Sequence, residues 1–158
     1  MKKICPECLN VYVGFADIAT CPLDTCEGLP LVVVDDLYVD AVKKFLKLCI
    51  KITRLDAGTL EEYSSGPLTC FVDTWYEGTK IDIEVIRELA LKVNDGTAIV
   101  NDIRQHDGYK TLMVKSKYKF DDMNPVTQLE CHVSFVKYLY RLLDKLENVG
   151  EHLLKFER

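Results

Sequence analysis

The chain contains seven cysteines, and four of them form two close pairs near its beginning. Cys5 and Cys8 enclose two residues, whereas Cys21 and Cys26 enclose four. Two thiolates from one tight turn can reach a single ion, and a second pair from another turn completes the tetrahedron that zinc prefers. Four thiolates leave no open coordination position, so such an ion would stabilise a fold and would not activate water. The spacing therefore predicts a structural zinc site formed by Cys5, Cys8, Cys21 and Cys26.

A disulfide framework and a set of buried thiols are the alternative interpretations of these cysteines. The odd number of thiols argues against a purely disulfide scaffold. Cys49, Cys70 and Cys131 lie within strand or helix patterns, which predicts that they pack in the interior. This use of cysteine fits a reducing, cytoplasmic compartment.

Composition indicates a globular protein with one main core. The 158 residues are 48% hydrophobic and 28% charged, which is ordinary for such a chain. The longest apolar run, residues 29–34, is too short to span a membrane, and residues 1–4 leave no room for a signal peptide. We therefore expect a cytoplasmic protein with a zinc ribbon at residues 1–34 and a main domain at residues 35–158.

Hydrophobic periodicity predicts three helices and four strands after the cysteine pairs. Asp35 and Asp36 offer capping oxygens to a first helix that ends near Leu48. The predicted strands are residues 50–53, 68–76, 97–103 and 109–120, and the second helix follows Asp82 and ends at Asn94-Asp95-Gly96. Short connections between strands favour an antiparallel sheet, so the fold class is α+β, with about four strands and three helices on one face.

The last helix has the strongest signal. Asn124 is an N-cap and Pro125 occupies the first helical position. An apolar stripe extends to about Val149-Gly150 and predicts the face that contacts the core: Val126, Leu129, Val133, Val136, Leu139, Leu143 and Leu146.

Catalytic motifs are scarce, and we expect no enzyme. One constellation, Asp73, Asp102 and His106 beside Asp107, could bind a divalent ion or exchange protons in a small metal-dependent hydrolase. The competing interpretation is that Asp102 faces outward and that the other polar residues belong to a turn. His132 lies between core positions of the last helix, which predicts packing rather than catalysis.

One stretch of the chain is basic although the whole carries a net charge of −5. Residues 104–119 have a net charge of +4, and Lys115, Lys117 and Lys119 share one face of the predicted strand. With Lys110, these lysines could contact phosphates while Tyr109 stacks on a base. The alternative is that the lysines protect the edge of a sheet from aggregation.

The first third of the chain resembles small phage and prophage proteins that begin with a Cys-Pro-x-Cys ribbon. The matching positions are Cys5, Pro6, Cys8, Cys21, Pro22 and Cys26, then residues 31–36 and the helix from Leu37. The family continues with a cysteine-rich Gly-His segment, whereas this chain has Cys49 and the different stretch 51–66. The resemblance implies a zinc ribbon in a viral accessory protein.

These observations predict a non-catalytic zinc-ribbon protein that binds another macromolecule. The net negative charge disfavours nucleic acid as the main partner, so we expect a protein, such as a host protein modulated by a phage-type factor. The alternatives are a nucleic-acid-binding accessory factor that uses the ribbon with the basic stretch, and the hydrolase.

Overall fold

A computed structural model describes residues 2–13, 18–28, 30–34, 36–48, 50, 52–56, 67–74, 81–106, 109–119 and 124–156. The strands are β1 (Lys2–Ile4), β2 (Val11–Val13), β3 (Val32–Val34), β4 (Ile52–Asp56), β5 (Pro67–Thr74), β6 (Ala98–Val100), β7 (Arg104–His106) and β8 (Tyr109–Lys119). The helices are the short 3-10 turn η1 (Asp36–Tyr38), α1 (Val39–Lys47), α2 (Ile83–Lys92) and α3 (Pro125–Phe156).

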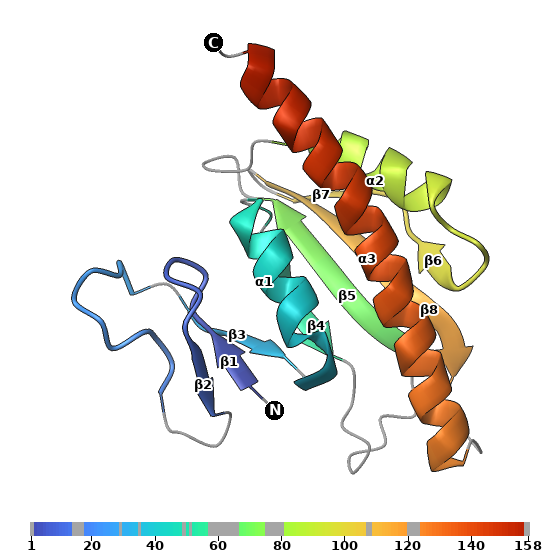
Figure 1. Ribbon diagram of the computed structural model, residues 1–158, viewed down its shortest axis with the longest axis horizontal. Helices are drawn as coiled ribbons and strands as arrows, with labels where there is room; N and C mark the ends of the chain where they lie inside the picture. Colours follow the sequence, from blue (N-terminus) through green and yellow to red (C-terminus); the bar gives the residue numbers. More distant parts are fainter. Residues whose placement is uncertain are drawn as a thin grey trace.

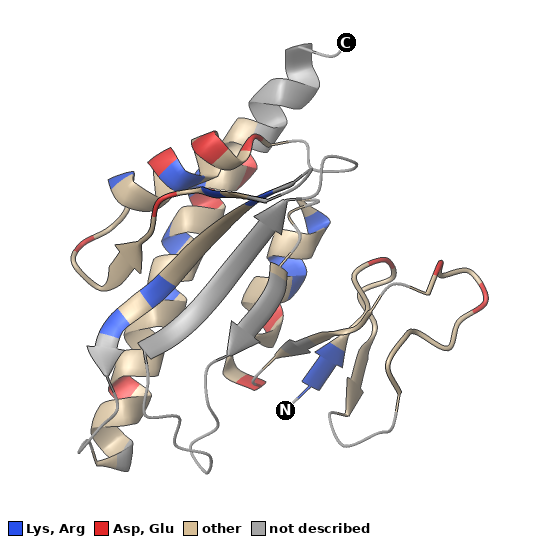
Figure 2. Ribbon diagram, turned by 180° about the vertical axis from the view of Figure 1, so that it is seen from behind, with Lys and Arg blue, Asp and Glu red and all other residues tan. Residues whose placement is uncertain are grey.

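All three α-helices lie on the same face of one sheet, with α3 between α1 and α2 (Figure 1). Seen from behind, the strands lie in front of the helical layer (Figure 2). The predicted α+β class is confirmed. Among the described residues, no helix combines the length and the apolar character needed to cross a membrane.

The sheet is larger than the sequence predicts. Its strand order is β2-β1-β3-β4-β5-β8-β6, and β7 pairs with β8 beyond the end of β6. The four predicted strands correspond to β4, β5, β6 and β8. The additional strands β1, β2 and β3 join them through the pair Val34↔Leu55, where β3 runs parallel to β4. The cysteine pattern gives no information on this pairing, because the pairing of strands depends on contacts between residues that are far apart in the sequence.

The cysteine segment, residues 1–34, therefore contributes to the main core. Ile4, Val32 and Val34 are buried in the same cluster as Phe45 and Tyr138. The cysteines lie beyond the ends of these strands, where Cys5, Cys21 and Leu31 form a separate small cluster. The segment is thus anchored at its strands, and its turns have little apolar packing of their own.

Helix ends follow local capping chemistry. Asp82 caps α2 by accepting a 3.0 Å hydrogen bond from the backbone N–H of Glu84, and Gly96 follows with a φ of +98°. Asn124 accepts a 2.9 Å hydrogen bond from the N–H of Thr127 at the start of α3, as predicted. The first helix differs from the prediction, because η1 precedes it and Tyr38 at its N-cap makes no side-chain capping bond. The predicted cap Asp35 lies outside the described residues.

The predicted core face of α3 is wrong in its first half. Val126, Leu129 and Val133 are exposed, whereas Gln128, Cys131 and Phe135 are buried. From Tyr138 to Leu146 the buried residues include the predicted Leu139, Leu143 and Leu146. The helix carries apolar residues on two faces, so periodicity alone cannot tell which face contacts the sheet. The helix also continues to Phe156, past the predicted end, and includes the tail that follows Gly150.

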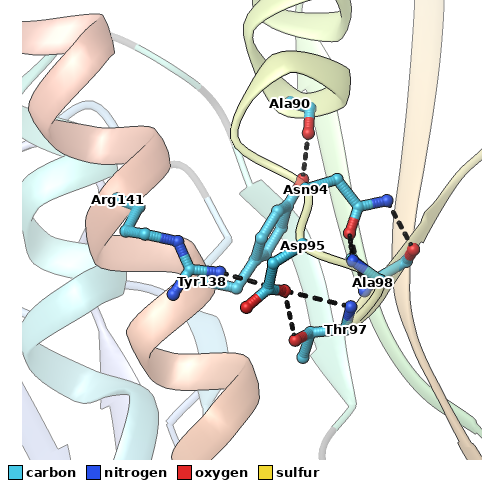
Figure 3. Close-up of polar contacts among 8 residues, drawn as sticks. Ala90, Asn94, Asp95, Thr97, Ala98, Tyr138 and Arg141 are labelled. Carbon is cyan, nitrogen blue, oxygen red and sulfur yellow. Dashed lines mark hydrogen bonds and ion pairs between the residues drawn. The ribbon is translucent and has the colours of Figure 1, made fainter.

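Polar contacts attach the turn between α2 and β6 to α3 (Figure 3). The Tyr138 hydroxyl donates a 2.8 Å hydrogen bond to the carbonyl of Ala90. The Asp95 carboxylate accepts hydrogen bonds from the N–H and the hydroxyl of Thr97 and lies 3.3 Å from Nη2 of Arg141. The Thr97 hydroxyl is the main cause that lowers the pKa of Asp95, and the positive charge of Arg141 also contributes.

We predict that Asp95→Asn destabilises the protein and that the loss disappears in acid. The lowered pKa means that ionised Asp95 stabilises the folded state above its unfolded pKa of about 3.9. This contribution is lost as the pH falls through the lower folded pKa. The melting temperature at neutral pH should fall by about 2–4 °C. Asp102→Asn, which removes an exposed ion pair, is the control. A deficit of the same size at neutral and strongly acidic pH would contradict the assignment.

Candidate metal centre

The first cysteine turn connects β1 to β2. The N–H of Leu9 donates to the carbonyl of Cys5 over 3.0 Å, and the N–H of Cys5 donates to the carbonyl of Asn10 over 3.0 Å. Leu9 has a φ of 64°, a left-handed conformation that costs a non-glycine residue roughly 1–2 kcal/mol. These bonds fold the chain back on itself, so Cys5 and Cys8 present their thiols from one turn.

The second cysteine turn precedes β3. The N–H of Cys26 donates a 3.1 Å hydrogen bond to the carbonyl of Leu23, and Gly28 follows with a φ of +80°. Pairing between Thr20 and Pro30 closes the base of this turn. The longer spacing of the second cysteine pair is therefore accommodated by an ordinary hydrogen-bonded turn.

The structure brings all four cysteines of the predicted site together. Their Sγ atoms lie within 4.8 Å of one another, and we call Cys5, Cys8, Cys21 and Cys26 the cysteine cluster. Sγ of Cys5 lies 3.8 Å from Sγ of Cys26, and Sγ of Cys8 lies 3.7 Å from Sγ of Cys21. Each of these two distances joins one turn to the other. The cluster could hold a metal ion, and within the described part of the chain it is the one group of this kind.

The cysteine cluster is buried on one side and open on the other. Cys5 and Cys21 are buried, Cys26 is half-buried and Cys8 is exposed. The two turns are also joined directly, because the N–H of Glu27 donates a 2.8 Å hydrogen bond to the carboxylate of Glu7. An ion held here would lie close to the surface, with protein packed behind it.

Tyr12 contacts the cysteine cluster, although the sequence pattern does not predict this contact. Its hydroxyl lies 3.2 Å from Sγ of Cys21. This bond is the main cause that lowers the pKa of Cys21 to about 7, and it is also the main cause that raises the pKa of Tyr12. Burial raises the pKa of Cys26 to about 12. On β2 the half-buried Tyr12 lies between the exposed Val11 and Val13. A strand of three residues is too short for its sequence to predict this contact.

Basic and buried residues alternate along β8 as predicted, but β8 lies inside the sheet and not at its edge. Lys115 is half-buried and Lys117 is exposed. Leu112, Val114 and Ser116, which point to the other face of the strand, are buried. The edge-protection interpretation is wrong, because β8 is paired with β5 on one side and with β6 and β7 on the other. Lys110 forms a 3.1 Å ion pair with Glu84 of α2. The side chains of Tyr109 and Lys119 lie outside the described part of the structure.

The structure describes only part of the predicted hydrolase site, which consists of Asp73, Asp102, His106 and Asp107. The Asp102 side chain is 96% exposed and forms a 2.8 Å ion pair with Arg87. Asp73 pairs through its backbone with Thr111, and His106 with Tyr109, so β8 separates their strands. The side chains of Asp73 and His106, and all of Asp107, lie outside the described residues. His132 is buried, and its Nδ1 lies 3.0 Å from the hydroxyl of Tyr38, in keeping with the predicted packing role.

Comparisons with protein-family models, with curated proteins and with solved structures found no match for the chain.

We predict that Tyr12→Phe weakens metal binding by the cysteine cluster about tenfold, because it removes a hydrogen bond to a ligand sulfur. The affinity for zinc can be measured by competition with a chromophoric chelator. Tyr140→Phe, which removes a hydroxyl from α3, should leave it unchanged. Equal affinities for wild type and Tyr12→Phe would show that the hydroxyl does not support the ligand.

Proposed function

We propose that the cysteine cluster binds one structural zinc ion. The observation that carries the proposal is the spacing of the sulfur atoms. Zinc–sulfur bonds of about 2.3 Å in a tetrahedron place neighbouring sulfurs about 3.8 Å apart. The distances of 3.8 Å and 3.7 Å between the two turns agree with this value. A reducing compartment such as the cytoplasm would keep the thiols available for the ion.

A zinc ion with four thiolates supplies structural cross-linking and no catalysis, because no coordination position is left for water or substrate. The residues of this chain then have simple tasks. The four sulfurs hold the ion, Tyr12 supports one of them, and Glu7 ties the second turn to the first. We therefore infer a binding protein rather than an enzyme.

A protein with a basic surface is the partner that best fits this end of the molecule. Glu7, Asp24 and Glu27 are exposed around the cysteine turns, and Leu23 is exposed between them. A four-thiolate zinc centre would add two further negative charges. The combined charge would repel nucleic acid and attract lysine and arginine side chains. The resemblance to phage and prophage ribbon proteins supports a host protein as this partner.

We predict that Cys8→Ser removes the zinc and loosens residues 5–31 while the helical layer stays folded. Metal binding in such small modules contributes about 10–16 kcal/mol, which is more than the local packing can replace. Purified wild type should contain one zinc per chain by elemental analysis. Hydrogen exchange should become fast in residues 5–31 of the variant and stay slow in α2 and α3. Cys131→Ala, which removes a thiol outside the cysteine cluster, should keep its zinc.

Two results would contradict this account. Wild type that lacks zinc after preparation under reducing conditions without chelator would remove the proposed ion. Loss of protection from hydrogen exchange throughout the Cys8→Ser chain would show that the turns and the main core unfold as one unit. Ile4 and Val34 pack in the main core and would couple the two parts.

Nucleic-acid binding is the second candidate, because Lys115 and Lys117 project from a central strand away from its buried residues. Basic segments of β8 are visible from the side opposite the helices (Figure 2). Three lysines in alternate positions could follow a phosphate backbone. The net charge of −5 opposes this function, and we rank it below protein binding.

We predict that wild type binds single-stranded DNA or RNA no more tightly than about 100 µM at physiological salt. Fluorescence anisotropy would measure this affinity. A salt-sensitive, micromolar complex that is lost when Lys115, Lys117 and Lys119 are all changed to Glu would favour the second candidate. Reversal of the exposed Lys47, Lys92 and Lys145 is the matched control, because it changes the net charge equally at other surfaces.

A further inference from the structure

The first half of α3 has an apolar face that the protein does not bury. Val126 is 67% exposed, Leu129 45% and Val133 37%, whereas an adjoining face of the same helix packs in the core through Phe135 and Leu139. The stripe continues into Val136 and Tyr140, which are half-buried and pack partly against the core. Nζ of Lys44 on α1 lies 5.0 Å from the centroid of the Tyr140 ring. We call Val126, Leu129, Val133, Val136 and Tyr140 the α3 seam.

The spacing of the α3 seam is that of a coiled coil. Its members follow one another at intervals of three, four, three and four residues, which is the repeat of a and d positions over two heptads. Its first three members, Val126, Leu129 and Val133, are exposed, and a helix that only covers its own core does not need apolar residues at these positions. The spacing therefore points to another helix as the occupant.

Charged residues beside the α3 seam indicate which kind of helix could pack against it. Glu130 and Lys137 are both exposed and each follows a d position of the seam, so they lie along the same side of it. Seven residues separate them, about 10.5 Å along the axis, which is too far for an ion pair within one helix. In an antiparallel contact with a second copy, Glu130 of each chain would meet Lys137 of the other. Such self-complementarity is the property of a twofold interface.

We propose that the protein forms a homodimer in which two α3 seams pack antiparallel and Glu130 pairs with Lys137 of the second copy. Two heptads make a small contact, so the association is weak and depends on concentration. The dimer leaves the cysteine cluster outside the contact, and the proposal does not depend on the zinc ion.

Sedimentation velocity at protein concentrations from about 1 µM to 500 µM tests the apolar part of the contact. Wild type should shift from monomer to dimer over this range. Leu129→Glu should remain monomeric, since the dissociation constant should rise roughly a hundredfold when a charge enters the seam. Leu91→Glu is the matched control, because Leu91 of α2 is also 45% exposed and lies outside the seam, and it should dimerise like wild type. Unchanged melting temperatures of the monomers exclude unfolding as the cause.

Charge reversal tests the partner and the direction of the helices. Glu130→Lys alone and Lys137→Glu alone should each weaken the dimer about tenfold, because like charges then face each other twice. Mixing these two variants should restore association, since both contacts in the mixed dimer are again between opposite charges. The double variant Glu130→Lys with Lys137→Glu should dimerise like wild type.

Wild type that stays monomeric at about 500 µM would overturn the proposal. So would a dimer that Leu129→Glu leaves intact, because its interface would then lie elsewhere. A dimer sensitive to Leu129→Glu, in which the mixed charge variants fail to associate, would contradict the antiparallel pairing. Zinc content measured on the same samples should equal that of wild type throughout, which separates failure of this proposal from failure of the metal site.

Discussion

The two cysteine turns meet at four sulfur atoms that converge within 4.8 Å. Among the described residues of the cysteine turns, the buried apolar cluster is small and consists of Cys5, Cys21 and Leu31. One turn also contains the unfavourable backbone conformation of Leu9. At the other end of the segment, Ile4 and Val34 are fully buried in the main core. The molecule is therefore secured by hydrophobic burial at β1 and β3, and in our account by a metal ion at the turns.

Features set by local chemistry were predictable from the sequence. The two cysteines of each pair lie close together because they belong to one turn. The caps Asp82 and Asn124 accept hydrogen bonds from residues at most three positions away. Four of the five strands described within residues 35–158, namely β4, β5, β6 and β8, were also predictable, since alternation and short connections identify them. The alternation of lysines with buried residues on β8 follows from the period of a strand and needs no tertiary information.

Features set by contacts between distant segments were not predictable. The parallel pairing of β3 with β4 and the central position of β8 depend on partners that no local pattern specifies. Tyr12 reaches Cys21 across nine residues, through a strand too short to show a clear period. The side of α3 that contacts the core was predicted incorrectly in its first half for a different reason. Its two apolar faces compete, and the larger buried side chains of Phe135 and Tyr138 decide which one enters the core. The first half of the face that the periodicity favoured, Val126, Leu129 and Val133, is instead exposed and belongs to the seam at which we place a second copy.

The central claim is that one zinc ion joins the two cysteine turns through four sulfur ligands. X-ray absorption at the zinc edge, on protein purified without chelator, tests it most directly because it reports the atoms bound to the metal. The account predicts a single shell of four sulfur atoms at about 2.3 Å. A shell that contains nitrogen or oxygen, or fewer than four sulfurs, would contradict it, because the cysteine cluster would then not be the closed structural site that the geometry supports.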